Sequence, residues 1–287
     1  MRVRESSFRA MVLVHVFTIS LVCAAAGAQT FQQIDVPGSS STAVFAINTA
    51  GDMAGTYTDQ NDVGHGFMLI GGVFTTIDVP GASYTAATGM NDNGAVVGFY
   101  TTPNGLAQGF LLTGGTFSTI NYPGAKATQL ESINNVGQIV GLFVPQRNPT
   151  TQGFEMSAGK FIVLEPRGSS RAQSNGINNA GVVVGFSSRP LTGARGFEFG
   201  QGTFTSIVFP GASSTVAWGV NDNNQVVGYE QTGQTVVTGF GWQQGTFTTF
   251  VFPGALQTLC LGINAAGQIV GYYQGSNLVP HGFLLIP

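Results

Sequence analysis

One stretch of sequence recurs along the chain, and its copy at residues 74–116 is FTTIDVPGASYTAATGMNDNGAVVGFYTTPNGLAQGFLLTGGT. Each copy opens with a phenylalanine, and successive openings are 43, 43, 44, 43 and 43 residues apart. The six opening residues, which begin units 1 to 6, are Phe31, Phe74, Phe117, Phe161, Phe204 and Phe247. A fixed period of this length is the signature of a tandem structural repeat.

Each unit predicts four short strands. Its text runs through a Phe-Thr-Thr-Ile segment, a Thr-rich stretch, a Val-Val-Gly-Tyr segment and a Gly-Phe-Leu-Leu segment, separated by turn residues. Such β-branched and aromatic runs are typical of strands. The chain has 42 glycines and almost no Glu/Lys/Leu periodicity of the helical kind. We therefore expect an all-β protein with no helix after the N-terminal segment.

The Ile-Asn-x-x-Gly element predicts a tight hairpin turn whose last residue has a positive φ. It recurs, for example, at 91–94, 134–137 and 264–267. Unit 5 has Asn224 in place of the glycine. Asparagine is the non-glycine residue that best tolerates the left-handed region, so the exchange fits a backbone requirement.

The strand after that turn is apolar on both faces, as in residues 96–99 and 269–272. It must therefore be covered on both sides. The glycine inside it indicates close approach of another backbone or of the repeated phenylalanine. The blades of a β-propeller meet these requirements, because each four-stranded sheet packs between two others. A β-solenoid is the alternative, although its coils usually need about half this period and no hairpin turns.

The two ends of the repeat region complement each other. The region begins with the segment expected to be the fourth strand of a four-stranded sheet, 31–36, and ends with the segment expected to be a third strand, 282–286. The fold class predicted is thus an all-β, six-bladed β-propeller of six repeats of about 43 residues, in which the N-terminal strand completes the last blade. A solenoid would instead need dissimilar caps at its ends.

The first 28 residues read as a secretory signal peptide. Arg2, Arg4 and Arg9 precede an apolar run from about Met11 to Cys23 and a small-residue stretch that ends at Ala28. This order is typical of a cleaved leader, and the run is short for a membrane anchor. We expect a secreted, extracellular or periplasmic protein whose residues 29–287 form a single domain. Cys260 is then the only cysteine, so no internal disulfide is expected.

Charge is unevenly distributed along the repeats. After residue 28 there are seven basic and twelve acidic residues, and all seven basic residues lie between Lys126 and Arg195, in units 3 and 4. Six of them are expected on one face, in the crossings between units and the loops between second and third strands: Lys126, Arg147, Arg167, Arg171, Arg189 and Arg195. A positive patch of this kind would bind an acidic polysaccharide or an acidic protein surface. The alternative is an ordinary solvated surface.

The other candidate residues give weaker indications of a metal or catalytic site. His65 and His281 hold equivalent places in separate units, and Asp35 and Asp78 recur before Pro-Gly, but no metal cluster or catalytic set is apparent. Asp92 is the only carboxylate of its turn, too few for a calcium loop. Cys260 aligns with core positions. We predict no cofactor, no metal and no catalytic residues.

Three motifs resemble the extracellular HAF-type repeats of bacterial exported proteins. They are His-Gly-Phe-Leu at 281–284, and Gly-Ile-Asn-x-x-Gly and Ile-Val-Gly-Tyr within 262–272. The resemblance covers all six units. The sequence departs from that pattern where four units lack the histidine and where Arg167 stands in place of a proline. The resemblance implies an exported repeat protein with a β-propeller-like fold, and no catalytic residues are carried over from it.

The function expected from these observations is that of an exported, non-enzymatic binding module that contacts protein or acidic glycan through the long-loop face. The alternative is a carbohydrate-active hydrolase or lyase on a propeller scaffold, which two carboxylates across a deep central pocket would favour. Nucleic acid is disfavoured by the net charge of −5 after residue 28. We expect no membrane span and a monomeric protein.

Overall fold

The computed structural model describes residues 29–147, 150–233 and 236–287. These residues form 24 β-strands and contain no helix. The predicted leader, residues 1–28, lies outside the described residues. Among the residues described there is accordingly no helix that is long and apolar enough to cross a membrane.

The strands assemble in chain order into antiparallel sheets. The first holds β2 (Ser41–Ile47), β3 (Met53–Thr58), β4 (Gly64–Ile70) and β5 (Val73–Ile77). The second holds β6 (Tyr84–Met90), β7 (Val96–Thr101), β8 (Ala107–Thr113) and β9 (Thr116–Ile120). The third holds β10 (Ala125–Ile133), β11 (Ile139–Pro145), β12 (Gln152–Ser157) and β13 (Lys160–Leu164). The fourth holds β14 (Arg171–Ile177), β15 (Val183–Ser188), β16 (Arg195–Gly200) and β17 (Thr203–Ile207).

The remaining strands form one eight-stranded sheet with two antiparallel halves. One half holds β18 (Ser214–Val220), β19 (Val226–Thr232), β20 (Val236–Gln243) and β21 (Thr246–Phe250). The other holds β22 (Gln257–Ile263), β23 (Ile269–Gln274), β24 (Pro280–Ile286) and β1 (Thr30–Ile34). A single parallel residue pair, Val237 with Gln257, links the two halves.

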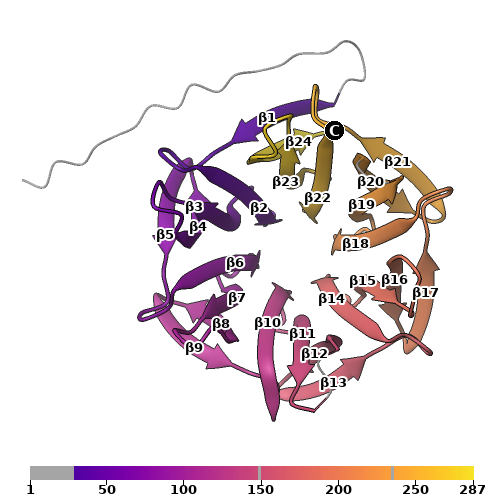
Figure 1. Ribbon diagram of the computed structural model, residues 1–287, viewed down its shortest axis with the longest axis horizontal. Helices are drawn as coiled ribbons and strands as arrows, with labels where there is room; N and C mark the ends of the chain where they lie inside the picture. Colours follow the sequence, from indigo (N-terminus) through magenta and orange to yellow (C-terminus); the bar gives the residue numbers. More distant parts are fainter. Residues whose placement is uncertain (1–28, 148–149, 234–235) are drawn as a thin grey trace, which may run out of the picture.

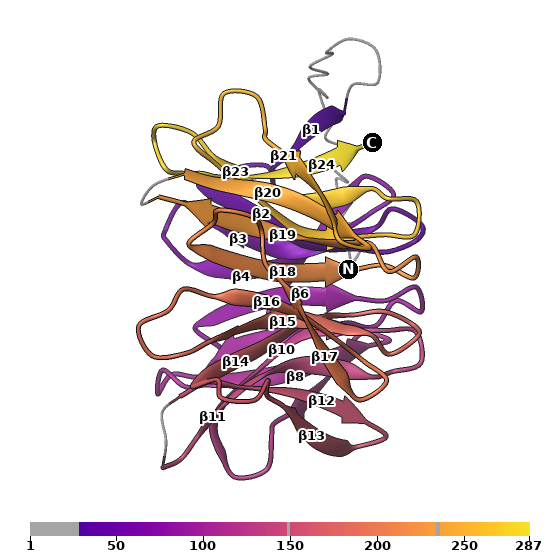
Figure 2. The same cartoon turned by 90° about the vertical axis from the view of Figure 1, so that its right-hand side faces the viewer.

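The sheets stand around a central axis like the blades of a propeller. Figure 1 shows the first strand of each sheet or half-sheet innermost and in chain order around the central axis: β2, β6, β10, β14, β18 and β22. Figure 2 shows the same ring from its edge. The all-β class and the propeller arrangement predicted from the sequence are confirmed.

The N-terminal strand is held by the C-terminal one, as the phase of the repeats predicts. β1 runs antiparallel to β24, with Phe31 opposite Leu285. The ring of Phe31 meets that of Phe283 edge-on, with centroids 5.3 Å apart. In the other units the opening phenylalanine meets the Gly-Phe ring of the same sheet in the same way, for example Phe110 with Phe117 at 5.6 Å. The ring is therefore closed by the same type of phenylalanine–phenylalanine contact that stabilises the other sheets.

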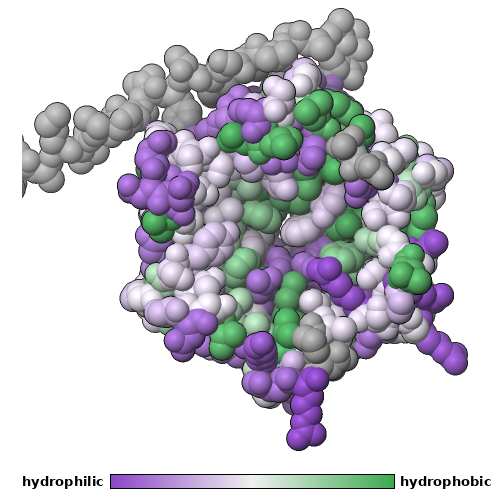
Figure 3. Space-filling model, in the orientation of Figure 1, coloured by the Kyte–Doolittle hydropathy of each residue, from purple (hydrophilic) through white to green (hydrophobic). Residues whose placement is uncertain are grey.

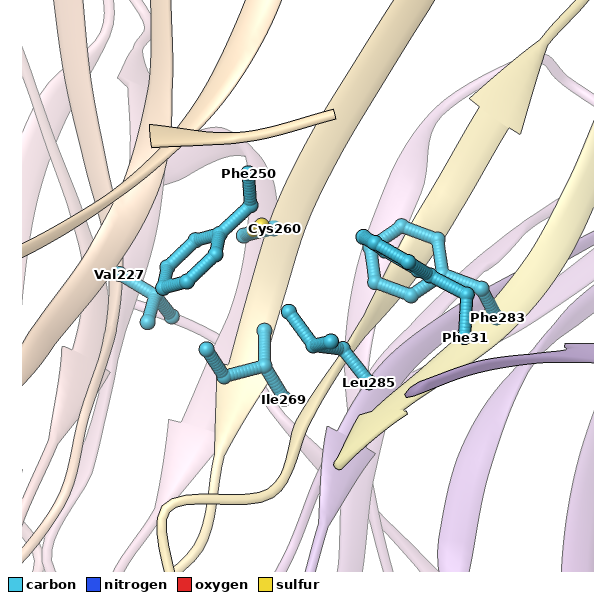
Figure 4. Close-up of a cluster of buried hydrophobic side chains, with 7 residues drawn as sticks. All are labelled: Phe31, Val227, Phe250, Cys260, Ile269, Phe283 and Leu285. Carbon is cyan, nitrogen blue, oxygen red and sulfur yellow. The ribbon is translucent and has the colours of Figure 1, made fainter. Parts of the chain in front are cut away.

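Phe31 also joins a buried cluster that spans both halves of the eight-stranded sheet. Figure 4 shows its seven members, Phe31, Val227, Phe250, Cys260, Ile269, Phe283 and Leu285. Cys260 is fully buried, as expected for a core position, and burial raises the pKa of its thiol. The thiol is therefore protonated and inert rather than a nucleophile.

Two predicted backbone requirements are confirmed. The turn glycines have positive φ, for instance 75° at Gly94, and Asn224 adopts φ 56° in their place. At Gly98, inside the second strand, an added Cβ would lie 1.9 Å from the backbone oxygen of Ala86 and 2.9 Å from the ring of Phe110. Only glycine leaves room there for both the neighbouring strand and the repeated phenylalanine.

The strands end on two faces of the disc. We call the turn face the one that carries the Asn-x-x-Gly hairpins between first and second strands. We call the loop face the opposite one, where second strands lead into third strands and fourth strands cross into the next sheet. The second strands reach the loop face at their last residues, Thr58, Thr101, Pro145, Ser188, Thr232 and Gln274.

Candidate ligand-binding pocket on the loop face

The structure places the six candidate basic residues at the loop face, with exposed side chains. Lys126 is the second residue of β10, and Arg171 and Arg195 begin β14 and β16. The other three occupy connections: Arg147 after β11, Arg189 after β15 and Arg167 before β14. The seventh basic residue, Lys160, begins β13 at the turn face.

Three of the six candidates, all arginines, surround one pocket of about 350 Å³, which we call the arginine pocket. They are Arg167, Arg189 and Arg195, contributed by the crossing into β14, the β15–β16 connection and the start of β16. Hydroxyl side chains supply much of the remaining wall: Ser169, Ser187, Ser188, Thr192, Thr205 and Ser206. No carboxylate is among the described residues that line it.

Local hydrogen bonds hold the two connections that carry these arginines. The amide of Arg189 donates to the hydroxyl of Thr192 at 3.1 Å, and the amide of Thr192 donates back to the carbonyl of Arg189 at 3.1 Å. The hydroxyl of Ser169 donates to the carbonyl of Pro166. The Arg189 guanidinium also donates to the carbonyl of Arg167 at 3.4 Å, which links the two walls of the pocket.

The remaining three candidates do not line the pocket. The guanidinium carbon of Arg171 lies 5.3 Å from the ring centre of Phe186, an arrangement that a cation–π attraction favours. Lys126 and Arg147 belong to the neighbouring sheet. The sequence assigned all six residues to one face, and the structure gathers only Arg167, Arg189 and Arg195 around the pocket.

The two candidate histidines are each paired with their own aspartate. Nδ1 of His65 lies 2.9 Å from Asp78, and Nδ1 of His281 lies 2.9 Å from Asp35. The two pairs belong to different sheets, so neither the histidines nor the aspartates form a joint site. No group of three or more His, Cys, Asp or Glu residues in the described part of the chain could hold a metal ion.

Asp92, the carboxylate of the turn that superficially resembles a calcium loop, is committed to neighbouring turns. It accepts hydrogen bonds from the amide and hydroxyl of Thr49 and from the side-chain amide of Asn135. Burial alone would raise the pKa of Asp92, but these hydrogen bonds outweigh it and lower the pKa. Its role is to join consecutive hairpins.

Sequence reasoning missed the hydroxyl residues of the arginine pocket and a set of axial residues. The axial residues directly precede the Gly-Ile-Asn text, or its variant, in each unit: Phe45, Thr88, Glu131, Asn175, Trp218 and Leu261. They line a cavity on the axis of the ring, and among the described residues of its lining Glu131 is the only carboxylate. The sequence contains a signal for the axial residues, because the side-chain chemistry at this one position varies widely between units while the neighbouring positions repeat.

Comparison with solved structures shows the same architecture in proteins of several kinds. A fungal lectin from Aleuria aurantia, described as a six-bladed β-propeller with a fucose recognition mode, superposes with a TM-score of 0.52 at 14% identity, over 87% of this chain and 92% of the lectin. AofleA from Arthrobotrys oligospora gives 0.58 at 11%, over 90% and 86%. The sialidase of Trypanosoma rangeli gives 0.53 at 7%, over 90% of this chain and 56% of the enzyme.

All three share the propeller fold. Identities this low establish the fold and nothing about activity. No protein-family model and no curated protein sequence matches the chain. The comparisons therefore support the architecture alone.

Proposed function

We propose that this protein is an exported, non-enzymatic carbohydrate-binding module that recognises acidic glycans, with the arginine pocket as its binding site. In this proposal the ring counts six blades, the leader directs export, and the repeats belong to the HAF type that they resemble. Arg167, Arg189 and Arg195 contact the acidic groups of the glycan, and the surrounding hydroxyls contact its sugar hydroxyls.

The observation that carries the proposal is the composition of the pocket. Three exposed arginines converge on about 350 Å³ lined by hydroxyls, and none of the three forms an ion pair with a carboxylate of the described residues. A guanidinium presents its N–H groups in a planar fork that matches a carboxylate or sulfate. An acidic sugar meets both kinds of group that the pocket offers.

The count of six blades is supported by the pairing of the strands. The eight-stranded sheet consists of two complete four-stranded halves, and one residue pair alone connects them. Each half has the same strand order as the four separate sheets. The Aleuria aurantia lectin, described as six-bladed, aligns over 92% of its own length.

The test is binding of the purified protein to polygalacturonate, with fully methyl-esterified pectin as the matched neutral polymer. We expect saturable binding to the acid form that weakens at high salt, because screening reduces attraction between exposed charges. The ester should not bind. Equal binding to both polymers, or binding indifferent to salt, would contradict the proposal and direct attention to a protein partner.

The same incubation tests the enzymatic alternative. A hydrolase or lyase would shorten the polymer, which chromatography of the products would reveal. The axial cavity has one carboxylate, whereas glycoside hydrolysis ordinarily uses two. We expect the chain length of the polymer to stay constant.

A further inference from the structure

The inner strands share a β-bulge that points one side chain per unit toward the axis. In each inner strand the register with the following strand shifts at the same place, between Val44 and Ala46 in β2 for example, so that Phe45 has no residue opposite it. The equivalent residues are Thr88, Glu131, Asn175, Trp218 and Leu261. Bulges characteristically re-aim a side chain, and these six all line one cavity of about 100 Å³.

This axial cavity is divided into a polar and an apolar half. Consecutive units 2 to 4 contribute Thr88, Glu131 and Asn175, and consecutive units 5, 6 and 1 contribute Trp218, Leu261 and Phe45. The rings of Phe45 and Trp218 have centroids 6.2 Å apart, although their strands are not neighbours in the ring. Figure 3 shows the hollow at the centre of the ring.

The polar half contains hydrogen-bond acceptors without a donor. The side-chain amide nitrogen of Asn175 donates to the carbonyl of Ala217 at 2.8 Å, which fixes how the amide is turned. Its Oδ1 is then buried with no partner among the described residues. Thr88 is different, because its hydroxyl already donates to the carbonyl of Leu130 at 2.7 Å.

Glu131 is the second unmet group. It is 5% exposed, and among the described residues no hydrogen bond or ion pair reaches its carboxyl group. Of the described residues that line the cavity, Glu131 alone is titratable. Burial raises its pKa to about 8, so the carboxyl group is mostly protonated at neutral pH. A cation within hydrogen-bonding distance would favour the carboxylate.

Size and ligand chemistry limit what can occupy the cavity. A cavity of about 150 Å³ holds benzene, so about 100 Å³ suits a molecule of two to four carbon atoms. One carboxylate and one amide oxygen are too few for Ca²⁺, which takes roughly six to eight oxygen ligands. Two acceptors facing aromatic and aliphatic side chains match a ligand with several N–H donors and a short hydrocarbon tail.

We propose that the axial cavity binds a small primary alkylammonium ion. Its N–H groups donate to the Glu131 carboxylate and to Oδ1 of Asn175, and its tail packs against Trp218, Phe45 and Leu261. This site is distinct from the arginine pocket and does not depend on glycan binding.

The test uses n-propylammonium chloride, with n-propanol and sodium butyrate as neutral and anionic probes of similar size. Trp218 fluorescence reports binding in a Trp242→Phe background, which removes the second tryptophan. We expect saturable binding of n-propylammonium, and affinities at least about tenfold weaker for the other two. Equal affinity for n-propanol, or no saturable response to n-propylammonium, overturns the proposal.

Variants locate the site. Glu131→Gln keeps the side-chain volume and should lower the affinity at least about tenfold, since a charge-assisted hydrogen bond is lost. Glu198→Gln is the matched control, because Glu198 lies on β16 outside the cavity and should leave the affinity unchanged. Thermal unfolding of each variant verifies that it is folded.

A readout on the unsubstituted protein covers the case in which Glu131→Gln fails to fold. The ¹³C signal of the Glu131 carboxyl group at neutral pH should move toward the carboxylate position when n-propylammonium is added, and should not move with n-propanol. A signal that ignores n-propylammonium contradicts the proposal independently of any variant.

Discussion

At the scale of single residues, we expect Glu131 to dominate the dependence of the free energy of unfolding on pH. Its carboxyl group is buried and its pKa is raised from 4.5 to about 8. Below pH 4.5 the group is protonated in both the folded and unfolded states. Between pH 4.5 and 8 the unfolded chain loses this proton while the folded protein keeps it, so the free energy of unfolding falls as pH rises. Above about pH 8 the effect is constant.

The prediction is that Glu131→Gln removes this loss of stability. Each pH unit is worth about 1.4 kcal/mol, so the variant should gain on the order of 5 kcal/mol relative to the native protein between pH 4.5 and 8. Urea denaturation of both proteins across this range measures the difference. Parallel stability profiles would show that Glu131 ionises in the folded protein as easily as in the unfolded chain.

At the scale of elements, the hairpin of the second sheet contains two glycines with opposite requirements. Gly94 has φ 75° and open space around it, whereas Gly98 lies against Ala86 and Phe110. We expect Gly94→Asn to cost less than about 1 kcal/mol, because asparagine already serves at position 224. Gly98→Ala should cost about 3 kcal/mol or more, because neither the backbone nor the ring can retreat.

Chemical denaturation of these two variants measures both effects. They lie in the same hairpin, so each serves as the control for the other. Equal destabilisation would mean that turn conformation, rather than packing inside the second strand, limits what the repeat can tolerate.

The inner strands show how far sequence reasoning reaches at this scale. The four-strand pattern, the turn with its positive φ and the crowded glycine follow from local spacing and sterics, and the structure confirms all three. The bulge does not follow from the spacing of the sequence. Simple alternation of side chains along the strand would not point Glu131 and Trp218 toward the axis. Which side chains meet across the axis depends on closure of the ring.

At the scale of the whole molecule, consecutive units are joined by a chain of asparagines at the turn face. In five of the six turns the side-chain amide donates to the backbone carbonyl of the equivalent asparagine in the next unit, as Asn91 does to Asn134 at 3.0 Å. The other four donors are Asn134, Asn178, Asn221 and Asn264. Asn264 donates to Asn48, so this chain crosses the closure between units 6 and 1.

Closure at the rim depends on Phe31, which is 5% exposed although it lies near the start of the described chain. We predict that Phe31→Ala costs about 3–5 kcal/mol, as expected for a buried aromatic side chain. Phe117→Ala, which removes the same type of contact within one sheet, is the comparison. Thermal unfolding measures both. A negligible effect at Phe31 alone would show that β1 is frayed and the ring open in solution.

The grouping of the arginines illustrates the limit of sequence reasoning at this largest scale. Strand order was enough to assign Arg167, Arg189 and Arg195 to one face. It could not tell which basic residues share a pocket, because that depends on how the crossing into β14 folds over the β15–β16 connection. Arg167 entered the pocket through such a contact with Arg189.

The most direct test of the proposed function compares two triple variants that remove the same charge from the same face. One changes Arg167, Arg189 and Arg195 to alanine, and the other changes Lys126, Arg147 and Arg171 to alanine. Calorimetric titration with polygalacturonate should show binding lost, by about 100-fold or more, in the first variant and reduced only a few-fold in the second. Equal losses in the two variants would contradict a defined pocket and leave only a diffuse positive surface.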